Sequence, residues 1–200
     1  MNDTSPLFGR TLRTGTLTFT FGSTLPHSRQ PAFGELVRVP AGAGQVYGVV
    51  YDVLTQDDPF VRQVIAASDQ LEAEKIADMR ERRQSPVEIT ALAVAYREGG
   101  HVYQRIPPRP PATLEPVYGC DDEEVREVLQ GWDSFRTILN HAQCPAEELL
   151  AACIRHAARC QPAERRRQFL VEAGRELTRQ LSADPLRLDA ILRRLGGDQF

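Results

Sequence analysis

The stretch from Phe33 to Val53 constrains the fold of this chain more than any other. It contains two β-rich runs, Glu35–Val39 and Gln45–Val53, joined by the turn-forming sequence Pro40-Ala41-Gly42-Ala43-Gly44. In both runs the side chains divide between two faces at every second position, and such alternation around a glycine-rich turn predicts a β-hairpin. Gly48 lies inside the second run, where a glycine indicates a sharp bend or a close backbone approach. We therefore expect a small β-barrel, whose strands must bend in this way.

Three further stretches are expected to complete this barrel. Alternation of leucine and phenylalanine with threonine predicts a strand over Gly9–Phe21, and residues 1–8 before it are expected to form a loose arm. A strong strand is predicted at Val87–Arg97, followed by a turn and a returning strand at His101–Ile106. The last strand is expected to be short and to lie within Leu114–Gly119.

Helical patterns occur in the middle and at the end of the chain. Apolar residues recur at helical spacing over residues 58–84, which predicts a helix inserted into the barrel. A second helix is predicted to start at Asp121, the N-cap, with Glu124 at the capping-box position. Residues 131–200 then predict three or four amphipathic helices. The sequence thus predicts an α+β chain: an arm, an antiparallel barrel with an inserted helix over residues 9–130, and a C-terminal helical segment.

Composition and charge indicate the class of protein and its expected location in the cell. The chain has 200 residues, a hydrophobic fraction of 42%, a charged fraction of 26% and a net charge of −3. These values are ordinary for a globular protein, and the negative charge argues weakly against bulk binding to a phosphate backbone. No apolar run approaches the roughly 20 residues that span a bilayer. The first ten residues lack the basic and apolar regions of a secretory signal, so we expect a cytoplasmic protein without a membrane partner.

Catalytic chemistry finds little support in the sequence. Lys75 is the only lysine beside 23 arginines, and no G-x-x-x-x-G-K-[ST] pattern occurs, which excludes an autonomous P-loop ATPase. The four histidines are scattered, and neither G-x-S-x-G nor H-E-x-x-H is present. We therefore expect a non-catalytic chain without a cofactor.

The order of elements resembles the HAS-barrel, the N-terminal domain of HerA-like DNA translocases and F1-type ATP synthase subunits. The similar segments are Gly34–Val39, Val46–Val53, Val87–Val94 and the closing run Pro107–Leu129. In those proteins an ATPase domain follows the barrel, whereas Gly131–Phe200 has a helical pattern and no phosphate loop. The resemblance implies a protein-binding or assembly module, an accessory subunit of a HerA-like DNA-processing ATPase or nuclease complex. Its expected contact surfaces are the sheet edges and the helical tail, and self-association is left open.

Direct nucleic-acid binding is a second hypothesis. An OB-like barrel binds single strands through cationic side chains and aromatic stacking platforms. The candidate residues are Arg10, Arg13, Arg29 and Arg38 with Phe19, Phe21 or Phe33 as platforms.

A metal-stabilised regulatory protein is a third hypothesis. Five soft ligands lie within twenty residues: His141, Cys144, Cys153, His156 and Cys160. Such residues could bind zinc or an iron–sulfur cluster. The competing interpretation is that the cysteines act as small buried apolar residues. Distance also counts against a metal site, because Cys153 and Cys160 are seven residues apart on one predicted helix, a rise of about 10 Å that one ion does not easily bridge. In the cytoplasm the four cysteines are expected to remain reduced, without a disulfide.

Overall fold

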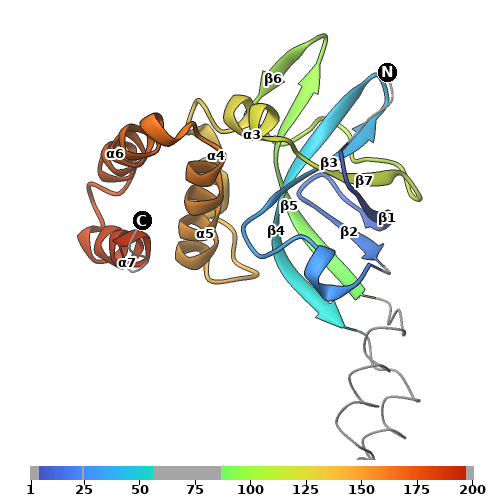
Figure 1. Ribbon diagram of the computed structural model, residues 1–200, viewed down its shortest axis with the longest axis horizontal. Coiled ribbons are helices and arrows are strands. Elements are labelled where there is room, and N and C mark those ends of the chain that lie inside the picture. Colours follow the sequence, from blue (N-terminus) through green and yellow to red (C-terminus); the bar gives the residue numbers. More distant parts are fainter. Residues whose placement is uncertain (1–4, 24, 56–86, 197–200) are drawn as a thin grey trace, which may run out of the picture.

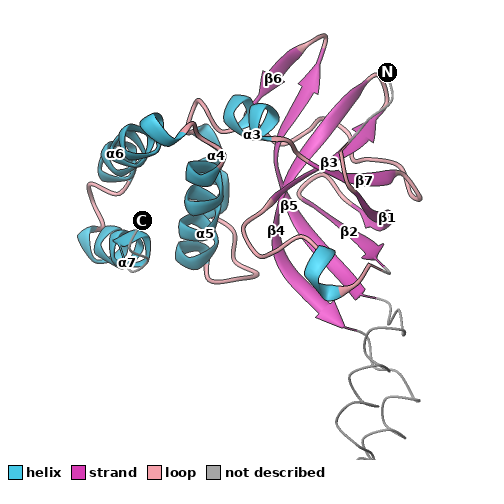
Figure 2. Ribbon diagram, viewed as in Figure 1, coloured by secondary structure: helices cyan, strands magenta, loops and turns pink. Residues whose placement is uncertain are grey.

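A computed structural model describes residues 5–23, 25–55 and 87–196 of the chain. A β-barrel and a layer of helices lie side by side in this part of the protein (Figure 1). Apart from a short 3-10 helix beside the strands, the helices lie on one side of the barrel, so the class is α+β as predicted (Figure 2). The helix predicted over residues 58–84 lies outside the described residues.

Six of the seven described strands form a closed antiparallel barrel. The strands are β1 (Leu7–Thr14), β2 (Thr18–Ser23), β3 (Leu36–Ala41), β4 (Gly44–Thr55), β5 (Val87–Glu98), β6 (His101–Tyr103) and β7 (Pro116–Gly119). Hydrogen-bonded neighbours follow the order β2-β1-β7-β3-β4-β5, and β2 pairs with β5 to close the ring. The short strand β6 pairs with β5 alone and extends the sheet beyond the barrel.

The predicted hairpin is confirmed as β3 and β4. The two strands pair from Leu36 opposite Val49 to Ala41 opposite Gly44. Gly48 marks a bulge in the pairing of β4 with β5, and a Cβ atom at this position would lie 2.7 Å from the ring of Phe19. The bend inferred from this glycine is therefore present, and it brings the backbone of β4 against a buried ring.

The prediction of a single strand over Gly9–Phe21 is wrong. The chain turns at Gly15, whose amide donates to the carbonyl of Thr18 at 2.8 Å, and β1 and β2 form a hairpin. The strand β1 also begins at Leu7, opposite Tyr118 of β7, so it overlaps the predicted arm by two residues. Both differences arise from strand pairing, which the local sequence pattern does not show. The alternation of apolar and polar residues continues across the turn at Gly15, so it does not reveal where one strand ends and the next begins.

Apolar side chains fill the barrel interior. They come from all six strands of the ring and, in the β3–β4 hairpin, from one face of each strand. The interior cluster consists of Phe19, Phe21, Val37, Val39, Val46, Val50, Val87, Ile89, Ala91, Ala93 and Val117, with Phe8, Ala41 and Tyr96 packed against it. The barrel is thus filled by side chains, as an eight-stranded or smaller barrel usually is.

Five α-helices are described after the barrel strands. They are α3 (Asp122–Val128), α4 (Asp133–Leu139), α5 (Ala146–Arg159), α6 (Ala163–Gln180) and α7 (Pro185–Gly196). The predicted capping box is present: the Asp121 carboxylate accepts from the amide of Glu124 at 2.8 Å, and Glu124 accepts from the amide of Asp121 at 3.2 Å. None of the helices in the described ranges combines the length and apolarity that a membrane crossing needs.

Gly34 brings the barrel and α5 into close contact. This residue precedes β3, has a φ of +87°, and donates its amide to the carbonyl of Val50 at 2.8 Å. A Cβ atom at Gly34 would lie 2.5 Å from the Cβ of Ala152 and 2.7 Å from its carbonyl carbon. A glycine is required here both by the left-handed backbone and by the close packing against the helix.

We expect Gly34→Ala to lower the free energy of unfolding by about 3 kcal/mol, because the added methyl group clashes with α5 and the backbone is strained. Urea denaturation followed by circular dichroism measures this change. The matched control is Gly174→Ala in α6, where a Cβ atom meets nothing within 4 Å. This control is expected to stabilise the protein by about 0.5–1 kcal/mol. Equal midpoints for Gly34→Ala and the parent protein would contradict the proposed packing role.

Candidate functional site

One apolar core joins the outer face of the barrel to the helices. Leu36, Tyr47 and Val49 from the β3–β4 hairpin and Leu92 and Val94 from β5 belong to the same buried cluster as the inner faces of α3, α4 and α5. The helix α5 is the centre of the helical layer, because α4, α6 and α7 all pack against it. The position of the helices relative to the barrel is therefore fixed by burial of a shared surface.

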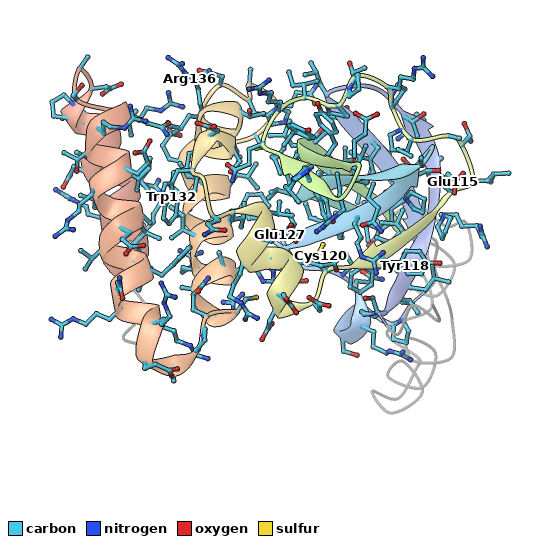
Figure 3. All side chains as sticks on the ribbon, turned by 90° about the horizontal axis from the view of Figure 1, so that it is seen from above. Glu115, Tyr118, Cys120, Glu127, Trp132 and Arg136 are labelled. Carbon is cyan, nitrogen blue, oxygen red and sulfur yellow. The ribbon has the colours of Figure 1, made fainter. Side chains whose placement is uncertain are left out.

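A polar network lies at the edge of this core. The buried Tyr47 hydroxyl accepts a hydrogen bond from Nε of Arg97 at 2.9 Å, and Arg97 pairs with Glu127 of α3 at 2.5 Å. Burial raises the pKa of Tyr47, and the hydrogen bond to Glu127 raises the pKa of Arg97. Figure 3 shows Glu127 and Cys120 where the helical layer meets the barrel, with Trp132 and Arg136 among the helices. The network fixes α3 against β4 and β5.

A groove opens where the barrel and the helical layer meet. Its volume is about 1110 Å³, and its walls come from β2, β5, the segment after β6, α4 and the α6–α7 connection. The apolar lining residues are Leu17, Leu92, Ile106, Leu139, Ala142 and Leu181. Leu17 is 52% exposed and Ile106 is 47% exposed, whereas Leu92, Leu139 and Leu181 belong to the shared core. The groove therefore has a floor built on the core and a wall of exposed apolar side chains.

Positive charge predominates in the lining of this groove. Four arginines line it together with two aspartates: Arg105, Arg136, Arg179, Arg187, Asp133 and Asp184. Arg179 pairs with Glu176, and Arg187 binds Glu147 and the carbonyl of Leu139. Within the described ranges, the exposed guanidinium groups of Arg105 and Arg136 have no hydrogen-bond or ion-pair partner. Two cationic groups thus remain available to an incoming molecule.

His141 lies at the rim of the groove, in the connection between α4 and α5. Its ring packs edge-to-face on Tyr51 of β4 with 4.5 Å between ring centroids, and burial lowers its pKa. Nε2 of His141 is buried without a hydrogen-bond partner among the described residues. Tyr51 in turn donates its hydroxyl to Gln143 at 2.7 Å. These contacts attach the α4–α5 connection to the barrel.

The four arginines predicted to bind nucleic acid do not form one surface patch of free cations. Arg38 is 5% exposed, donates to Glu124 and Ser5 at 3.0 Å each, and lies 5.1 Å above the ring of Tyr118. The exposed Arg13 pairs with Glu88 at 2.5 Å. Arg10 donates to the carbonyl of Leu114 at 2.8 Å, and Arg29 is exposed in a short 3-10 helix, His27–Arg29. The structure thus uses Arg38 within the fold, and it places Arg10 and Arg13 on β1 and Arg29 in the 3-10 helix.

Two of the three phenylalanines predicted as stacking platforms are buried, so the prediction is wrong for these two. Phe19 and Phe21 are 1% and 0% exposed, because β2 turns both rings into the barrel interior. Of the three phenylalanines only Phe33 is exposed, at 39%. Alternation correctly predicts that the two rings of β2 share a face, but it does not tell which face is the inside of the barrel.

The five predicted metal ligands are not brought together. Within the described residues, no group of three or more His, Cys, Asp and Glu side chains is placed to hold a metal ion. The only pair that the structure brings close is His156 and Cys160, with 4.0 Å between Nε2 and Sγ. All four cysteines of the chain are free thiols. Burial raises the pKa of Cys153 and Cys160 to about 12, so both keep the proton that a metal would have to displace.

The groove residues Arg105 and Arg136 are not found by reasoning from the sequence. Arg105 follows the edge strand β6 and precedes the proline-rich run, a position that indicates an exposed loop but no particular partner. Arg136 lies on a short helix, and its place opposite the barrel depends on the packing of α4 against β5. No local pattern could have joined these two residues.

Comparison with protein-family models and with curated sequences finds no match. The evidence for a function therefore comes from the residues of this chain.

We expect Arg38→Ala to lower the free energy of unfolding by about 3 kcal/mol, because it removes the partner of Glu124 at a buried position. Chemical denaturation measures this loss. The exposed Arg29 provides the control, and Arg29→Ala is expected to change stability by less than about 0.5 kcal/mol. A stable Arg38→Ala variant would contradict the structural role of this arginine.

The two partly buried histidines are expected to make stability depend on pH. Burial lowers the pKa of His141 and of His156 below the ordinary value of 6.5. The unfolded chain then binds more protons than the folded protein, so the free energy of unfolding falls as the pH drops below 6.5 through the folded pKa values.

Unfolding measured between about pH 7.5 and pH 5 tests this dependence. His141→Gln and His156→Gln should each flatten the profile. Slopes identical to that of the parent protein for both variants would overturn the assignment.

Proposed function

We propose that this chain is a non-catalytic protein-binding module that acts as an accessory subunit of a larger assembly. The observation that carries the proposal is the groove, where Leu17 and Ile106 remain exposed beside the unpaired Arg105 and Arg136. Apolar side chains that stay exposed within a concave surface mark interaction sites, and arginine is enriched in them. The groove lies beside the edge strand β6 and on the helical segment, the two surfaces expected to make contacts.

The class of partner is proposed from the resemblance to the HAS-barrel. A closed six-stranded antiparallel barrel is compatible with a small barrel domain of that kind. The helical layer follows the barrel where an ATPase domain follows it in HerA-like translocases. We therefore propose that the partner is an ATPase or nuclease subunit of a DNA-processing complex, which supplies the chemistry that this chain lacks.

Nucleic-acid binding by the barrel is the less favoured function. The proposal of a protein partner is supported by the loss of Phe19 and Phe21 as stacking platforms and by the use of Arg38 inside the fold. Stacking on exposed aromatic rings supplies much of the affinity for single strands, and salt weakens such binding strongly. These two properties separate the two functions in an experiment.

The proposal is tested by purifying the tagged full-length chain from its native host, with nuclease digestion and increasing salt, and identifying retained proteins by mass spectrometry. We expect an ATPase or nuclease subunit in near-stoichiometric amount, followed by direct calorimetric binding of the two purified proteins. A parallel titration uses a fluorescent oligothymidylate. Recovery that depends on intact nucleic acid, together with salt-sensitive oligonucleotide binding by the chain alone, would contradict the proposal.

A further inference from the structure

We infer that the groove between the barrel and the helical layer accepts an acidic, partly apolar segment of a partner protein. The inference rests on the proposed function and specifies the chemistry of the segment that is bound. It follows from three properties of the groove: which charges are free, which apolar groups are exposed, and which groups would repel a nucleic acid.

The free charges favour an anionic segment. Arg105 comes from the segment after β6 and Arg136 from α4, so two different elements contribute the two cations to the groove lining. Both guanidinium groups are exposed and have no partner among the described residues. A guanidinium binds a carboxylate through two parallel hydrogen bonds, which fixes the orientation of the bound group. Aspartate or glutamate side chains of one segment could bind both cations.

The exposed apolar side chains of the groove indicate that the bound segment also carries apolar residues. Leu17, immediately before β2, is 52% exposed, and Ile106 is 47% exposed beside Arg105. Apolar side chains of the partner would cover these two residues and remove their surface from water, which stabilises the complex by about 25 cal/mol for each Å² buried. An amphipathic segment with carboxylates on one side and aliphatic side chains on the other could pair with the two arginines and cover the two apolar side chains.

A protein segment fits this groove better than a nucleic-acid strand. Asp133 and Asp184 also line the groove, and their carboxylates would repel a continuous row of phosphates. Among the described lining residues His141 is the only aromatic side chain, and its ring is already packed against Tyr51. A single strand would therefore find no free stacking platform, whereas a peptide can place its carboxylates beside the arginines alone.

The test compares two charge-matched double variants of the full chain. Arg105→Glu/Arg136→Glu reverses both free cations of the groove. Arg109→Glu/Arg175→Glu reverses two exposed arginines that do not line it and changes the net charge by the same amount. A displayed random-peptide library is selected on the parent protein, and the enriched peptides are labelled with fluorescein and titrated against all three proteins. Circular dichroism confirms that both variants are folded.

We expect enriched peptides that combine Asp or Glu with aliphatic residues. Their affinity should fall at least about tenfold for Arg105→Glu/Arg136→Glu and stay unchanged for Arg109→Glu/Arg175→Glu. Replacement of the acidic residues of the peptide by Asn and Gln should cause a similar loss. Failure to enrich acidic peptides, or equal losses for both variants, would overturn the inference. So would competition by oligothymidylate, or a groove-dependent dimer of this chain in sedimentation.

The same variants separate this inference from the proposed function. If the native partner is retained equally by both double variants, the chain binds a protein through another surface, and only the groove inference fails. If the parent protein retains no partner while the selected peptides bind in the groove as expected, the assembly role fails and the peptide specificity stands.

Discussion

The burial of β4 and β5 on both faces is the constraint on which the rest of the structure depends. Val46 and Val50 face the barrel interior, whereas Tyr47 and Val49 face the helices. Each fully buried side chain of this size contributes about 2 kcal/mol through removal from water. Because one pair of strands contributes to both cores, the barrel and the helical layer stabilise one another. The groove is fixed for the same reason, since its floor includes Leu92 and other members of the shared core.

Charged side chains at the edge of this shared core determine where the first helix lies. Arg38 on β3 and Arg97 on β5, two strands separated by β4, bind Glu124 and Glu127 on one helix. A partly buried ion pair adds little net stability compared with an apolar contact of the same size, but a displaced helix would leave charges without partners. These pairs therefore select one position of α3, and the apolar contacts supply most of the energy. Two arginines of this arginine-rich chain therefore position a helix within the fold.

Local patterns predict much of this fold but little of its candidate site. The hairpin, its bend at Gly48 and the capping box at Asp121 are all encoded within short stretches. The turn at Gly15 is missed because alternation continues through it, and the partners of β1 are missed because β7 lies far along the chain. An arginine in a strand, such as Arg38, has the same local pattern whether it faces solvent or a buried glutamate. Roles set by long-range packing are therefore absent from the pattern.

The position of β7 in the ring has a consequence for biosynthesis. This short strand lies between β1 and β3, although it follows all the other ring strands in the sequence. The hairpins β1–β2 and β3–β4 leave the ribosome first, yet the ring cannot close until residue 119 has emerged. Contacts between such distant segments form slowly because a long loop must be ordered first. During translation the nascent hairpins therefore expose unpaired edges and the rings of β2 to solvent or to a chaperone, well before α5 can cover the sheet.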